Sequence, residues 1–91
     1  MRAFGTREDL AILLFLGSVD SAEKRDIVSE VEMAPMTVHR HLLELEEMGL
    51  ITVDIEMGRR QGRHVRYSLD RQETAIAIDR LRAALLGDLH P

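Results

Sequence analysis

The chain has 91 residues, a formal net charge of -4 and no cysteine. Its length fits one domain, and the missing cysteines exclude disulfide bonds and thiolate chemistry. The longest apolar run, Leu10 to Leu16, is shorter than the ~18 residues of a membrane span, and no small-residue cleavage site follows it. We therefore expect a single domain, residues 1–91, in a cytoplasmic protein without a signal peptide or a membrane partner.

The first helix is predicted over residues 6–16. Thr6 is a suitable N-cap residue, and Gly17 is suited to end the helix in a left-handed conformation. One apolar stripe at helical spacing, which we expect to face the core, consists of Leu10, Leu13 and Leu14. A helix with a second apolar side needs a second surface to pack against. We assign to a dimer interface the residues of that side, Ala11, Ile12 and Phe15.

Two further helices are predicted before residue 50. The second runs from about Ser21 to Val31, with Asp20 or Ser21 as the N-cap and with Asp20 and Glu23 resembling a capping box. After a break, Pro35 begins a third helix, Pro35–Met48, at the first helical position. Its predicted core stripe, at i, i+4 and i+7, is Val38, Leu42 and Leu45. Two short helices separated by a tight turn form a helix-turn-helix.

The pattern then changes from helical spacing to alternation. Ile51, Val53 and Ile55 alternate with polar residues, which predicts a half-buried strand. A glycine-bounded turn at residues 58–62 and a return strand over 65–69 complete a hairpin. The last helix is expected over residues 70–86, and its apolar surface is wider than one core-facing stripe. From this helix we assign to the dimer interface Ile76, Ile78, Leu81 and Leu85.

The stretch from Lys24 to Leu69 resembles the winged helix-turn-helix domains of small prokaryotic transcription regulators, with the arsenic-repressor (ArsR) and multiple-antibiotic-resistance-repressor (MarR) groups nearest. The resemblance is carried by residues 37–42 (TVHRHL), 45–51 (LEEMGLI), 62–63 (GR) and 65–69 (VRYSL). It implies a mainly α fold with a small β-hairpin, in the order helix, helix, helix, hairpin, helix. It also implies a homodimer that binds double-stranded DNA. Two departures are Ala34, where such domains usually place a capping Ser or Asp, and the missing cysteine metal motif.

The third helix is the expected DNA-reading element, because a helix fits the major groove, where each base pair shows a distinct pattern. Arg40 can donate two hydrogen bonds to guanine, and His39 can donate one to a base or phosphate. Thr37 and the free N–H groups of the first turn suit a phosphate. Pro35 and Met36 can contact a thymine methyl group. His41 lies nearer the core edge, and we expect it to be structural.

The basic residues of the hairpin form the second expected DNA contact. Within residues 58–66 there are four arginines and no acid, and they are Arg59, Arg60, Arg63 and Arg66. Removing these four from the 12 basic residues leaves 8 against 16 acidic ones. The positive charge is therefore concentrated in residues 58–66, which we call the wing. We expect the wing to contact the DNA backbone or a narrow minor groove, where the negative potential is enhanced.

The alternative is a winged helix used as a protein-interaction module within a larger complex, without DNA. Its surface would be the acidic body with the apolar Met36 and Leu43. An enzyme is not expected, because the chain has one lysine, no cysteine and no glycine-rich phosphate loop. We expect no cofactor and no metal. His39 and His41 are roughly 200° apart around a helix, and Asp88 with His90 lacks a second set of ligands. A small-molecule effector, and the choice between repression and activation, stay open.

Overall fold

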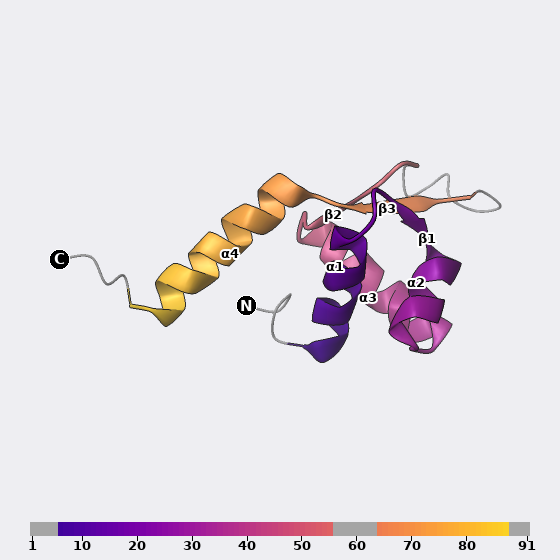
Figure 1. Ribbon diagram of the computed structural model, residues 1–91, viewed down its shortest axis with the longest axis horizontal. Coiled ribbons are helices and arrows are strands. Elements are labelled where there is room, and N and C mark those ends of the chain that lie inside the picture. The colour runs from indigo at the N-terminus through magenta and orange to yellow at the C-terminus, as the bar shows by residue number, and fades with distance from the viewer. Residues whose placement is uncertain (1–5, 56–63, 88–91) are drawn as a thin grey trace.

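The computed structural model describes residues 6–55 and 64–87. Over these residues the elements follow in the order α1 (Arg7–Gly17), β1 (Ala22–Glu23), α2 (Lys24–Val31), α3 (Pro35–Glu47), β2 (Ile51–Val53), β3 (Arg66–Leu69) and α4 (Arg71–Leu85). The mainly helical class with a small antiparallel sheet is confirmed. Figure 1 shows α1, α2 and α3 grouped beside the sheet, with α4 extending away from them.

The helix ends follow local capping chemistry. The Thr6 hydroxyl accepts a hydrogen bond from the backbone N–H of Asp9 at 3.1 Å, which makes Thr6 the N-cap of α1. Ala34 precedes α3 without a side-chain cap, and Pro35 occupies the first helical position. The Asp70 carboxylate accepts a hydrogen bond from the Glu73 N–H at 2.9 Å and caps α4. The predicted starts of α1 and α3 are confirmed.

The start of the second helix was predicted wrongly. Ala22 and Glu23 are extended and pair with Tyr67 and Arg66 of β3, so α2 begins three residues later than expected, at Lys24. The capping box is accordingly formed by Glu23 and Asp26 rather than by Asp20 and Glu23. Ala22 is buried and pairs with Tyr67 of β3. This tertiary contact determines its extended conformation, although the local sequence favours a helix. Two residues are too few for alternation to be visible in the sequence.

The sheet contains three strands among the described residues, in the order β1-β3-β2. On one side of β3, Ile51 lies opposite Leu69 and Val53 lies opposite Tyr67. The hairpin expected from the sequence is thus present as the β2–β3 pair, although β2 is shorter than the alternating pattern indicated. The turn at residues 58–62 lies outside the described residues.

The buried face of α1 also differs from the expected one. The buried residues follow i, i+3, i+4 and i+7 spacing and are Asp9, Ile12, Leu13 and Leu16. Leu10 and Leu14, which were expected to face the core, are 39% and 74% exposed. Because α1 is apolar on both sides, hydrophobicity alone could not select the buried one. The choice follows from packing against α2, α3 and β3. The predicted core stripe of α3, Val38, Leu42 and Leu45, is confirmed.

The last helix contributes little to the core of the single chain. None of the α4 residues is buried, and Figure 1 shows most of the helix projecting beyond the other elements. Ala77 is the α4 residue that packs against the core. Within residues 6–55 and 64–87, no helix combines the length and the apolar character needed to cross a membrane.

Candidate nucleic-acid interface

The exposed side of α3 is set by the core stripe on its opposite side. Val38, Leu42 and Leu45 are at most 1% exposed, and they fix the rotation of the helix about its axis. Pro35, Met36 and Arg40 are exposed as a result, and Met36 retains 76% of its surface. An arginine that projects from an exposed helix has the shape and donors required for a guanine edge.

His39 is held in place by the one lysine of the chain. It is half-buried, and its Nδ1 atom lies 2.8 Å from Nζ of Lys24 at the start of α2. An ammonium group has only donors, so Nδ1 of His39 accepts this hydrogen bond and Nε2 carries the ring proton. His39 therefore presents an N–H donor on its other nitrogen. Lys24 could not be recognised from the sequence as a partner of His39, because it lies 15 residues away and a lone lysine gives no spacing signal.

The start of α3 leaves backbone donors without a side-chain cap. Ala34 has no side-chain oxygen to accept from the first turn, and Pro35 has no N–H. The N–H groups of Met36 and Thr37 follow it at the positive end of the helix dipole. Such a terminus favours an anion. Thr37, half-buried at the third helical position, brings a hydroxyl group to the same end.

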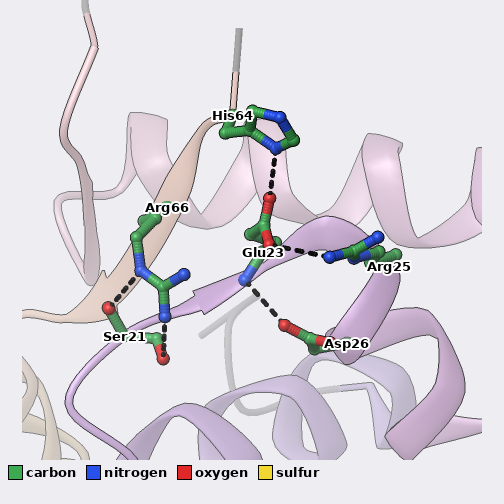
Figure 2. A network of polar contacts seen from close by, with 6 residues as sticks. All are labelled: Ser21, Glu23, Arg25, Asp26, His64 and Arg66. Carbon is green, nitrogen blue, oxygen red and sulfur yellow. Dashed lines mark hydrogen bonds and ion pairs between the residues drawn. The ribbon is translucent and has the colours of Figure 1, made fainter.

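Arg66 is engaged in contacts within the chain. Its Nε donates to Oγ of Ser21 at 2.7 Å, and its Nη2 donates to the Ser21 carbonyl at 3.1 Å. These bonds tie β3 to the segment before β1 (Figure 2). The guanidinium is still exposed, but two of its five N–H donors are committed to Ser21. The other three wing residues expected to contact DNA, Arg59, Arg60 and Arg63, lie outside the described residues.

A charged network surrounds the short strand β1 (Figure 2). The Glu23 carboxylate lies 2.9 Å from Nδ1 of His64 and 3.4 Å from Nη2 of Arg25. The hydrogen bond from His64 lowers the pKa of the Glu23 carboxyl. Burial opposes this effect, and the charges of Arg25 and Arg66 lower the pKa further. The carboxylate therefore links the start of α2 to His64, two residues before β3, a contact that could not be predicted from the sequence.

An apolar groove lies on another part of the surface, between α1 and α4. Its volume is about 470 Å³, and its lining combines Leu10, Leu13, Leu14, Gly17, Ser18, Leu69, Thr74 and Ile78. The exposed Leu85 and Leu86 lie at the end of α4. The groove and these two leucines give the terminal helices an apolar surface that packs on nothing else in the described chain.

The residues assigned to a dimer interface differ in how far they are exposed in the single chain. Ile12 is completely buried in the core of the single chain, so it has no surface to offer a partner. Ala11 and Phe15 are half-buried, and Phe15 packs against the core. Ile76 and Leu81 are half-buried, whereas Ile78 and Leu85 are exposed. The exposed large apolar residues of α1 are Leu10 and Leu14 instead.

No protein-family model matches the chain, and no curated protein matches it either. The resemblance to winged-helix regulators therefore stays a prediction from the residues themselves.

Proposed function

We propose that the protein is a sequence-specific, DNA-binding transcription regulator of the winged-helix type. The observation that carries this proposal is the exposed side of α3. Arg40 is exposed on a helix whose other side is packed into the core, next to a half-buried His39 that is held by Lys24. In this proposal α3 enters the major groove and reads bases through Arg40.

The contacts around α3 support a helix-turn-helix arrangement. Three residues, 32–34, separate α2 from α3, and the Lys24–His39 hydrogen bond joins the two helices. The uncapped first turn of α3 provides N–H groups for one phosphate. The arginines at 59, 60 and 63 would supply the salt-dependent contacts to the backbone that give DNA binding most of its affinity.

We propose that the working form is a homodimer. Leu14 and Leu85 are each 74% exposed, and the same apolar surface contains both a groove and projecting leucines. A twofold interface pairs one surface patch with its own copy, so the α4 leucines of one protomer can fill the groove of the other. Two copies of α3 would then contact half-sites of a pseudo-palindromic operator, about 34 Å apart for one helical turn.

The test of DNA reading begins with selection of binding sites from a random duplex pool by the full chain. Arg40→Ala should lose affinity for the selected site by roughly 5- to 150-fold, equivalent to ~1–3 kcal/mol of discrimination at one base pair. Its affinity for random duplex should change much less. Arg80→Ala, which removes an exposed arginine of α4, is the matched control and should bind as the parent does.

A pool without enrichment, or an Arg40→Ala chain that binds the selected site normally, contradicts the proposal. The runner-up would then be a winged helix that binds a protein within a larger complex. The 76% exposure of Met36 and the net charge of -4 are the features that favour it.

A further inference from the structure

Two polar side chains lie inside the apolar core, where α1 crosses α3. The side chains of Asp9 and His41 are only 3% and 10% exposed, and Oδ1 of Asp9 lies 2.8 Å from Nδ1 of His41. Asp9 occupies the core stripe of α1 together with Ile12 and Leu16. An ionisable pair in this position is costly to bury, which raises the question of what the pair does.

A third ligand-bearing residue completes the cluster. Glu44 follows His41 by three residues, so the two side chains lie on one side of α3. One ligand atom from each of Asp9, His41 and Glu44 can be chosen so that all three lie within 4.8 Å of one another. Ligand atoms bound to one zinc ion at ~2.0–2.2 Å stand roughly 3 to 3.5 Å apart. Small side-chain movements would therefore bring the three atoms to binding distance.

We propose that Asp9, His41 and Glu44 bind one divalent transition-metal ion between α1 and α3. The ligand set is one imidazole nitrogen and two carboxylate oxygens, with water at the remaining positions, as in open metal sites. An imidazole ligand favours zinc and its neighbours over magnesium or calcium. Two carboxylates and a cation also offset each other's charge beside the buried side chains of Asp9 and His41, while the half-buried Glu44 leaves one side of the site open to water.

The position of the site gives it a consequence for the proposed function. Asp9 is adjacent to Leu10 of the proposed dimer surface, and His41 is adjacent to Arg40 of the proposed base-reading surface. A bound ion would hold α1 and α3 at a fixed separation. Metal occupancy would then change the stability of the form that binds DNA. This coupling rests on the proposed function, whereas metal binding itself does not.

The site was not visible in the sequence, because Asp9 and His41 lie 32 residues apart. The expectation of no metal rested on pairs that are close in sequence, His39 with His41 and Asp88 with His90, and each pair supplies only two ligands. The proposed site depends on tertiary packing, because the contact of α1 with α3 brings the Asp9 carboxylate to His41.

The experiment is a calorimetric titration of the metal-free full chain with Zn²⁺ and no DNA, supported by thermal unfolding with and without Zn²⁺. We expect one ion per chain and a rise in Tm on binding. Glu44→Gln changes a half-buried residue and is the more conservative variant. It should weaken Zn²⁺ binding at least tenfold, and His41→Gln should do the same.

The controls are His39→Gln, His64→Gln and His90→Gln, which alter the other three histidines and should retain the parent affinity. Circular dichroism shows whether each variant is folded. If His41→Gln is unfolded, the Zn²⁺ affinity of Glu44→Gln alone tests the proposed site. The proposal is overturned if Zn²⁺ does not bind saturably, if folded Glu44→Gln binds as tightly as the parent, or if a control variant abolishes binding. Because no DNA is present, the result is independent of whether the chain binds an operator.

Discussion

At the scale of single residues, the contact between Asp9 and His41 joins two helices that are distant in sequence. His41 was expected near the edge of the core, and it is buried. Asp9 is one of two acidic residues in the first turn of α1. Its position at i−3 from Ile12 and i−7 from Leu16 places it on their side of the helix. This spacing could have indicated that Asp9 is buried. Because α1 is apolar on two sides, the sequence did not show which side faces the core.

Removing the Asp9 carboxylate should destabilise the fold. Asp9→Ala leaves the Nδ1–H of a buried imidazole without the acceptor it has in the structure, and an unsatisfied buried donor costs about 1–3 kcal/mol. Urea unfolding followed by circular dichroism measures the loss. Glu8→Ala removes the other acid of the first turn and therefore only the helix-dipole interaction, worth ~0.3–1 kcal/mol. Equal losses for the two variants would show that the buried pair adds nothing.

The Glu23–His64 contact predicts a pH effect at the base of the hairpin. Glu23 has a pKa below its ordinary value of 4.5, chiefly because of the hydrogen bond from His64. A carboxyl group whose folded pKa is lowered stabilises the fold above its unfolded pKa. That contribution is lost as the pH falls through the folded value.

In His64→Ala the pKa of Glu23 should rise toward 4.5, as measured by a carbon NMR titration of the carboxyl group. His39→Ala serves as the control, because His39 contacts Lys24 rather than Glu23, and it should leave that pKa in place. An unchanged Glu23 titration in His64→Ala would mean that the contact does not persist in solution.

At the scale of elements, much of the secondary structure could be predicted, but not every face and boundary. The caps of α1 and α3 follow from Thr6 and Pro35, because capping depends on neighbouring residues. β1 could not be predicted, since Ala22 and Glu23 become a strand only by pairing with β3. The exposed side of α3 followed from its single apolar stripe. The face of α1 did not, because this helix has two.

The corrected face of α1 gives a test of the proposed dimer. Leu14 is exposed in the single chain and lines the groove, so Leu14→Glu should disrupt association without unfolding the protomer. Sedimentation at micromolar concentration should give twice the 10.4 kDa chain mass for the parent and a single chain mass for the variant. Thr52→Glu alters an exposed residue of β2 and should remain dimeric. A monomeric parent, or a fully dimeric Leu14→Glu, would contradict the interface.

At the scale of the whole molecule, the described residues divide into a packed body and a projecting helix. α1, α2, α3 and the sheet share the buried core, whereas α4 buries none of its residues. The apolar surface of α4 was predicted from its wide spread of aliphatic residues. How little of it the body covers could not be predicted, because the direction in which α4 leaves β3 is not encoded in its periodicity.

This division has a consequence for how the protein responds to its own concentration. A helix as short as α4, 15 residues, is marginally stable in water when nothing packs against it. If a second protomer supplies that packing, helix formation and association become one coupled equilibrium. Dilution then melts α4 as well as separating the chains. The ordered fraction of α4 would rise with protein abundance, and the amount of protein in the cell would itself act as a switch.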